Sequence, residues 1–235
     1  MNIIDSYARL PIGLYQDIRA LQEGDTPYDD IDLRVKIMAM LTGQTERDVL
    51  NAPLAESSVW ADAITFLERP APEIGRIASS YRCGRFELVP TGDPRNITTA
   101  QYIDFQTFAP EGDARLVELL SVFLVPRGCK YNDGYDIAEV QAAIREDLYV
   151  TDALAVSAFF LTKLAALIRT SRSSLARMAR KEKDPRKAAR IRTELARLER
   201  LTETVLKASR PAGDGSPTST TSAPPAAAPG TTSGK

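Results

Sequence analysis

Apolar residues recur at helical spacing along most of this chain, most densely between residues 96 and 170. Within that stretch one series follows three- and four-residue steps before Pro126 and Gly128: Leu116, Leu119, Leu120, Phe123 and Leu124. This spacing places the series on one face of a helix, which we expect to belong to the core. Further helices are predicted behind three helix-start signals: Thr98 or Thr99, the D-x-x-E capping box of Asp136 with Glu139, and Thr151 with Asp152.

Shorter helices separated by tight stops are predicted for the first 70 residues. Apolar residues at helical spacing recur in each of them, and Gly43 and Pro70 mark two of the stops. The expected helices begin after Gly13, at Asp29 or Asp30, and at Ser57 or Ser58, and a brief T-x-x-D turn is expected at Thr45. This alternation describes a compact helical unit.

The apolar period changes between residues 79 and 90. Tyr81 and Cys83 precede Gly84, and Phe86 and Leu88 follow it in alternation with polar residues. Alternation of this kind favours two short strands joined by a tight turn. Because a lone hairpin is marginally stable in water, we expect it to lie against the helices or to pair with another subunit.

A heptad-like apolar seam follows Thr151. Steps of three, four, seven and three join Leu161, Leu164, Ile168, Leu175 and Met178. Pro185 then ends the helix, because a residue before proline avoids the α region. A second stripe lies beyond it: Ile191, Leu195, Leu198 and Val205. Two facing stripes predict an antiparallel helical hairpin with a first arm roughly 50 Å long, whose tip projects from the body.

These patterns together predict a mainly α protein in three parts. Residues 1–150 are expected to form a compact acidic helical body with one small β hairpin near residues 79–90, and residues 151–210 a long, basic, antiparallel coiled helical hairpin. Residues 211–235 consist almost entirely of small, polar or Pro residues. Such a segment cannot bury enough surface to offset the entropy of ordering, so we expect a disordered tail.

Deleting this tail, from Ala212 to Lys235, is expected to leave the melting temperature nearly unchanged, because the segment contributes no buried apolar surface. Differential scanning calorimetry of the full and truncated chains measures the difference. A fall of several degrees on truncation would show instead that the tail packs on the body.

Charge divides sharply along the chain. Residues 1–162 contain 14 Lys+Arg against 25 Asp+Glu, whereas residues 163–210 contain 15 against 5. The basic residues gather around the expected hairpin tip: Arg172, Arg177, Arg180, Lys181, Lys183, Arg186, Lys187, Arg190 and Arg192. A division of this size indicates contacts between acidic and basic parts, within one subunit or between subunits.

The basic cluster is the candidate partner-binding site, and three interpretations stay open. It could dock on an acidic protein surface, including the acidic part of a neighbouring copy in a homo-oligomer. It could hold the phosphates of a nucleic acid. It could also be a plain solvated face. The cluster has no interleaved aromatic residues and matches no DNA-reading motif, which favours docking on protein over binding of nucleic acid.

Catalytic chemistry has little support. The chain has no histidine, no GxxxxGK(S/T) phosphate loop and no GxGxxG, so the commonest general base and the usual phosphate-binding turns are missing. Cys83 and Cys129 stand 46 residues apart with no CxxC pattern, which predicts two buried or half-buried thiols and no metal site. We therefore expect a non-enzymatic protein that needs no cofactor.

No targeting or membrane segment is expected. Met1 leads into a charged stretch without a continuous apolar run, so the sequence predicts no signal peptide. No stretch was expected to reach the roughly 18 apolar residues of a membrane span. The default expectation is a cytoplasmic protein without a membrane partner.

Three segments carry a resemblance to a known group of proteins. They are TTAQYIDFQTF, LLSVFLVPRGCKYNDGYD and DALAVSAFFLTKL. Together they resemble tailed-bacteriophage proteins encoded among the tail genes, described as tail assembly chaperones or small virion structural proteins. The layout extends from about residue 10 to 210, and the likeness is sharpest from about 98 to 163. These are fold-bearing residues, and no set of functional residues comes with them.

The resemblance implies a role in phage morphogenesis. A tail assembly chaperone of this kind would bind phage tail components in the host cytoplasm, before the tail tube polymerises. The alternative within the group is a virion structural subunit, such as a connector, ring or tail component. An alternative from another class is a nucleic-acid-binding protein that acts through the basic hairpin tip.

Overall fold

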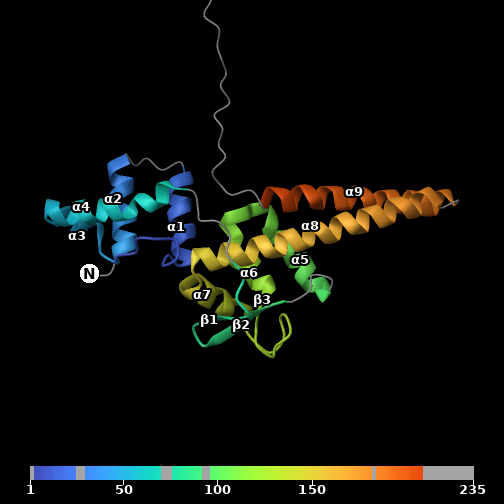
Figure 1. Ribbon diagram of the computed structural model, residues 1–235, viewed down its shortest axis with the longest axis horizontal. Helices are drawn as coiled ribbons and strands as arrows, with labels where there is room; N and C mark the ends of the chain where they lie inside the picture. The colour runs from blue at the N-terminus through green and yellow to red at the C-terminus, as the bar shows by residue number, and fades with distance from the viewer. Residues whose placement is uncertain (1–2, 25–29, 70–75, 92–95, 182–183, 209–235) are drawn as a thin grey trace, which may run out of the picture.

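The computed structural model describes residues 3–24, 30–69, 76–91, 96–181 and 184–208. The fold is mainly α, as predicted, with a small antiparallel sheet. Figure 1 shows an elongated molecule: the N-terminal helices lie at one end, the sheet lies near the middle, and a long helical hairpin projects at the other end. The predicted disordered tail, residues 211–235, lies outside the described residues.

The N-terminal helices are α1 (Ile12–Glu23), α2 (Asp30–Thr42), α3 (Glu46–Asn51) and α4 (Leu54–Ala63), followed by the 3-10 helix η1 (Ile64–Glu68). The T-x-x-D turn predicted at Thr45 is the start of a helix, in which the side chains of Thr45 and Asp48 form a reciprocal capping box. The predicted start of α4 at Ser57 or Ser58 is wrong. The helix begins after Pro53, whose ring fixes its φ at −55° and whose side chain forms no cap hydrogen bond.

Helix α1 packs closely on α7 (Ile137–Asp147), and Gly13 makes this approach possible. A Cβ added at Gly13 would overlap the Arg145 side chain and lie 2.7 Å from the Arg145 carbonyl oxygen. Beside this contact, Arg145 forms an ion pair with Asp17 of α1. Position 13 therefore requires glycine, because any larger residue would overlap Arg145.

Gly13→Ala is expected to lower the free energy of unfolding by about 1 to 3 kcal/mol, as overpacking does. At an open helix position the same change stabilises by about 1 kcal/mol, so the sign is diagnostic. Urea unfolding measures the effect. Arg145→Ala in the Gly13→Ala background should recover part of the loss, because it removes the side-chain overlap but leaves the clash with the carbonyl. A stabilised Gly13→Ala protein would show that the helices do not approach this closely.

The predicted β hairpin is confirmed as β1 (Tyr81–Cys83) and β2 (Phe86–Pro90), and a third strand joins it. Strand β3 (Leu124–Pro126) pairs antiparallel with β2, with Leu88 opposite Pro126 and Pro90 opposite Leu124. The apolar series was expected to continue through Leu124 as helix, but α6 (Leu116–Phe123) ends one residue earlier. All three residues of β3 are buried, so no alternation of polar and apolar positions marks the strand.

Helix α5 (Thr99–Phe108) begins at the predicted cap, where Thr98 and Gln101 form a reciprocal capping box. The Gln101 side chain is buried and its Nε2 also donates to the Val122 carbonyl of α6 at 2.8 Å. Ile103, a large apolar residue of the same helix, is 55% exposed. The chain then continues through the 3-10 segment η3 (Ala109–Arg115), in which Gly112 takes a φ of 57°.

The start of α7 is also where predicted, but its cap differs. The Asp136 side chain accepts from the Ala138 N–H at 2.9 Å. The reciprocal partner of the predicted capping box, Glu139, forms an ion pair with Arg85 of the β1–β2 turn. A long-range cation therefore replaces the local backbone donor that the D-x-x-E pattern indicates.

Three phenylalanine rings mark the centre of the main core. Phe123 of α6 stacks on Phe160 with ring centroids 4.3 Å apart, and Phe105 of α5 lies 5.9 Å from Phe123. Phe123 and its neighbour Leu120 are buried, as predicted. Phe160 belongs to α8 (Val150–Lys181), so the first arm of the hairpin enters the core of the body.

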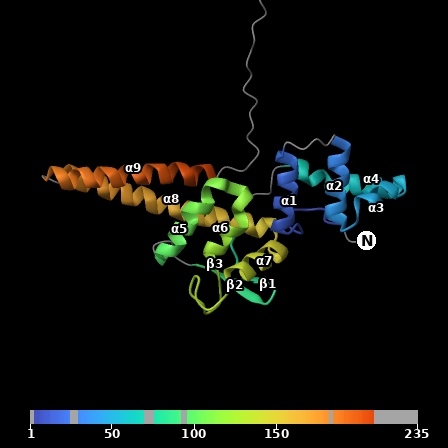
Figure 2. The ribbon, with the colours of Figure 1, turned by 180° about the vertical axis from the view of Figure 1, so that it is seen from behind.

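The hairpin itself is confirmed. Helix α8 ends at Lys181, α9 (Pro185–Ala208) begins at the predicted break, and the two helices lie side by side (Figure 2). The other end of α9 packs against η3. The seam of α8 is shorter than expected, because Met178, one turn from the end of the helix, is 47% exposed. The side chains of Leu198 and Val205 lie outside the described part.

Helix α8 is long and apolar enough, by length and composition alone, to cross a membrane, contrary to the expectation that no stretch would qualify. Its most apolar window has a mean hydropathy of 1.6, and 44% of that window is buried inside the protein. A core helix passes the same test, so one such helix among the described residues is weak evidence for a membrane span.

Candidate functional site

The hairpin tip is held by a rigid base. Along the first half of α8 the side chains that face the body are buried in the main core, among them Val156, Phe160 and Leu164. Farther out, Arg172 forms an ion pair with Glu199 of α9 at 2.9 Å across the hairpin. Arg172 therefore helps to join the two arms, whereas the other predicted tip residues lie closer to the turn.

Basic side chains from both arms meet around the turn. The structure brings together the last two turns of α8 and the first two of α9, and the exposed cations there are Arg177, Arg180, Lys181, Arg186, Lys187, Arg190 and Arg192. We call these seven residues the basic tip. Lys183, also predicted to belong to it, lies outside the described residues.

The cations of the basic tip have no acidic partners in the described part of the chain, where no carboxylate lies within ion-pair distance of any of the seven. The α8 cations lie at a helix C-terminus, where positive charge is favourable. Arg186 and Lys187 lie in the first turn of α9, where positive charge is unfavourable. Asp184 caps that turn by accepting from the Arg186 N–H at 2.8 Å.

The placement of Arg186 and Lys187 shows that hairpin stability does not explain the tip charge. A helix N-terminus favours acidic residues, and this one carries cations beside its single capping aspartate. The buried residue of this turn is Ala188, whose small side chain lets the arms approach each other. Because alanine adds little apolar signal, the spacing of large apolar residues did not reveal it.

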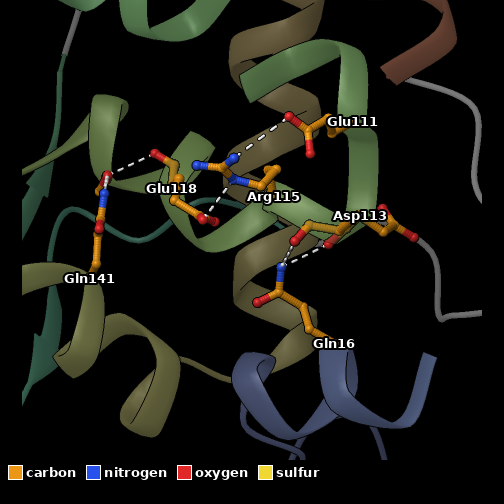
Figure 3. A network of polar contacts seen from close by, with 8 residues as sticks. Gln16, Glu111, Asp113, Arg115, Glu118 and Gln141 are labelled. Atoms are coloured by element: carbon orange, nitrogen blue, oxygen red, sulfur yellow. Dashed lines mark hydrogen bonds and ion pairs between the residues drawn. The ribbon is translucent and has the colours of Figure 1, made fainter. Parts of the chain in front are cut away.

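Helix α9, the second arm of the hairpin, contacts η3, and a polar network surrounds η3 (Figure 3). Gln16 of α1 donates from Nε2 to the carbonyl oxygens of Asp113 and Ala114, at 2.8 and 3.0 Å. Arg115 lies between Glu111 and Glu118, at 3.6 and 2.7 Å. These contacts tie η3 to the body, and η3 in turn contacts α9.

Burial perturbs one acid of this region. Desolvation raises the pKa of the Asp113 carboxyl, and the nearby Arg19 guanidinium offsets part of this rise. The Tyr15 hydroxyl, which donates weakly to Asp113 at 3.4 Å, also has a raised pKa because it is desolvated. Both groups serve the junction between α1 and η3.

The two cysteines are buried and half-buried thiols, as predicted. Burial, the largest cause, and the nearby carboxylates of Asp147 and Asp152 together raise the pKa of Cys83 to about 12. A thiol in such surroundings stays protonated at neutral pH and is a poor nucleophile. Desolvation also raises the pKa of Asp152, which lies in the first turn of α8.

A cavity of about 520 Å³ lies between α2, η1 and the end of α1. Its lining is largely aliphatic, with Ile37, Ile64 and Leu67 on its walls and the exposed ion pair of Arg34 and Glu68, at 3.4 Å, beside them. Its described lining contains no cysteine, serine, threonine or tyrosine that could act as a nucleophile. Within the described residues, no group of three Cys, Asp or Glu side chains is arranged to hold a metal ion.

Comparisons with protein-family models, with curated proteins and with solved structures found no match for this chain. The resemblance to tailed-phage proteins therefore remains an expectation from the sequence.

Proposed function

We propose that this chain is a non-enzymatic assembly protein of tailed bacteriophages, similar in role to a tail assembly chaperone, and that it binds a protein partner through the basic tip. The observation that carries the proposal is the charge of the tip, which has no ion-pair partner among the described residues, on a hairpin anchored in the core. A solvated surface gains little from seven cations of one sign, because like charges repel. An acidic partner surface would relieve this repulsion.

Protein is a better fit for the tip than nucleic acid. No aromatic residue follows Phe160 in the whole sequence, so the outer part of the hairpin, including the basic tip, has no aromatic side chain on which bases could stack. Met178 also lies exposed among the cations, and exposed methionine is typical of adaptable protein-binding surfaces. These features support docking on an acidic protein surface that also presents apolar side chains.

In this role the hairpin would act as a reaching arm. The body holds the base of α8, and the tip meets exposed helical or apolar segments of a tail component, such as the length-determining protein, before the tube polymerises around it. Release would follow when the growing tube covers the same segments. No covalent chemistry is needed.

Mass spectrometry of purified particles of the virus that encodes the chain tests this role. A chaperone leaves the particle, so we expect the chain to be absent from particles and present in lysates during assembly. Recovery from particles at a fixed copy number would contradict the chaperone and favour a virion structural subunit.

A further inference from the structure

A groove between α1, α2 and η1 presents aliphatic side chains to an open cavity. The cavity of about 520 Å³ has a floor of Ile37 and Ile64, which are 4% and 8% exposed. Leu33 and Leu67 form half-buried walls that pack against the main core. The volume lies within the range of about 300 to 1,000 Å³ that is typical of ligand sites. An apolar group that filled this space would be removed from water together with these side chains.

Residue spacing on two elements produces one continuous groove. Four lining residues of α2 fall at three- and four-residue steps and therefore share one face: Asp30, Leu33, Arg34 and Ile37. Ile64 and Leu67 lie three residues apart on η1, which places them on one edge of that 3-10 helix. The α2 face extends over about 10 Å, or two turns of a helix.

The rim of the groove is open and partly apolar. Ile31 borders the cavity and is 69% exposed. The charged rim residues Asp30, Arg34 and Glu68 are exposed as well. A site for a small molecule encloses roughly 70 to 90% of its ligand, whereas an occupant of this groove keeps one side in solvent. An open groove of this kind fits a segment of a protein of which only one face is apolar.

The charges at the rim indicate what such a segment carries. Arg34 of α2 and Glu68 of η1 approach each other at 3.4 Å, but their side chains are 62% and 66% exposed. A pair of this kind contributes little to stability, so an incoming segment can displace it. Asp30 forms no ion pair with any other described residue. The groove thus presents two carboxylates and one guanidinium, which favours a partner with a positive charge.

We propose that this groove binds an amphipathic helix of a protein partner, with aliphatic side chains at three- and four-residue steps and a lysine or arginine beside them. The aliphatic side chains lie over Ile37 and Ile64 and against Ile31, where association removes apolar surface from water. The basic residue pairs with Asp30. A helix docked in this way makes the same ridge-into-groove contacts with α2 that helices make within a protein.

The groove is a second interaction surface, separate from the basic tip, and it does not rest on the proposed function. Figures 1 and 2 show α2 at one end of the molecule and the turn between α8 and α9 at the other. A charge-reversed protein, the tip variant, carries Arg180→Glu, Lys181→Glu, Arg186→Glu and Lys187→Glu. We expect the tip variant to bind a helix in the groove as the unmodified protein does, so failure of one proposal leaves the other intact.

Nuclear magnetic resonance of the full chain, with isotope-labelled Ile and Leu methyl groups, tests the groove. The probe is a synthetic helical peptide with leucines at three- and four-residue steps and lysines in the adjacent turn. We expect it to shift the methyl signals of the lining residues Ile31, Leu33, Ile37, Ile64 and Leu67. A peptide with alanines in place of the leucines should not bind, and one with glutamates in place of the lysines should bind about threefold more weakly or worse. Absence of shifts, shifts confined to other methyl groups, or a glutamate peptide that binds as tightly as the lysine peptide overturns the proposal.

A pair of matched substitutions locates the contact. Ile31→Ser changes one exposed apolar side chain at the rim and should weaken binding of the lysine peptide by about tenfold, because that side chain is covered in the complex. Leu54→Ser is the control, since Leu54 of α4 is 85% exposed and does not belong to the lining of the groove. It should leave binding unchanged. Both side chains are exposed, so both variants should keep the circular dichroism of the unmodified protein, and equal loss of binding in the two would contradict docking at the groove.

Two other occupants have different signatures in the same experiment. If the lining methyl signals shift with rising protein concentration in the absence of peptide, the groove belongs to a second copy of the chain. If octanol shifts them and the peptide does not, the cavity holds a small apolar ligand. Either result overturns the docking of a partner helix.

Discussion

Leu120→Ala is expected to lower the free energy of unfolding by about 2 to 5 kcal/mol, and Phe123→Ala by about 3 to 5 kcal/mol. Both side chains are buried in α6, and the Phe123 ring lies between those of Phe105 and Phe160. Removing the ring leaves a cavity bordered by α5 and α8, and close-packed neighbours fill such a space only in part. The loss would also loosen the base of the hairpin, because Phe160 belongs to α8.

Chemical denaturation with urea measures these changes, and Ile103→Ala is the matched control. Ile103 is a large apolar residue of the adjacent helix α5, but it is 55% exposed. Its truncation is expected to change the free energy of unfolding by no more than about 0.5 kcal/mol. A comparably small effect for Leu120→Ala or Phe123→Ala would show that α6 is not at the centre of the core.

Reversing the charge of the basic tip should abolish partner binding while the fold survives. The variant replaces Arg180, Lys181, Arg186 and Lys187 with glutamate. Each side chain is exposed and lies off the apolar seam, where a single charge contributes under about 1 kcal/mol to stability. At a docking surface the same substitutions place like charges opposite the acidic partner, which costs several kcal/mol and suppresses association.

Coexpression with the length-determining tail protein, followed by co-purification, measures this binding. A matched control reverses four exposed cations elsewhere: Arg69, Arg76, Lys130 and Arg169. The control has the same net charge as the tip variant, so it separates the position of the charges from their number. Equal loss of binding in both proteins would assign the interaction to overall charge and would contradict a docking site at the tip.

Local signals in the sequence were sufficient for several elements. Thr45 and Thr98 begin helices because each has a partner three residues later that completes a reciprocal cap. Pro185 ends the first arm of the hairpin through the constraint that it places on the preceding residue. In each case the interaction lies within one helical turn, so neighbouring residues determine it.

Long-range contacts account for the differences. Strand β3 exists because the edge of β2 offers it hydrogen bonds, and a fully buried strand carries no period to distinguish it from a helix. Glu139 does not complete the cap of α7 because it pairs with Arg85, which lies 54 residues away in the chain. Glycine is required at position 13 because a larger side chain would overlap Arg145. None of these partners is visible in a local pattern.

Part of the candidate site could likewise be predicted from the sequence, and part of it depends on long-range contacts. The excess of basic residues near the turn is a property of composition, so the sequence identifies the residues of the tip. The ion pair of Arg172 with Glu199 depends on the register of the two arms, which the apolar stripes do not fix. The apolar seam includes Met178, and only the fold shows that this side chain is exposed.

The central claim is that the basic tip binds protein and not nucleic acid, and a gel-shift experiment tests it most directly. The unmodified protein and the tip variant are mixed with DNA and with RNA at about 50 and 200 mM salt, a range over which phosphate contacts lose most of their affinity. We predict no retardation of either nucleic acid by either protein at either salt concentration. Retardation at 50 mM that falls at 200 mM and vanishes in the tip variant would contradict the claim and assign the tip to nucleic acid.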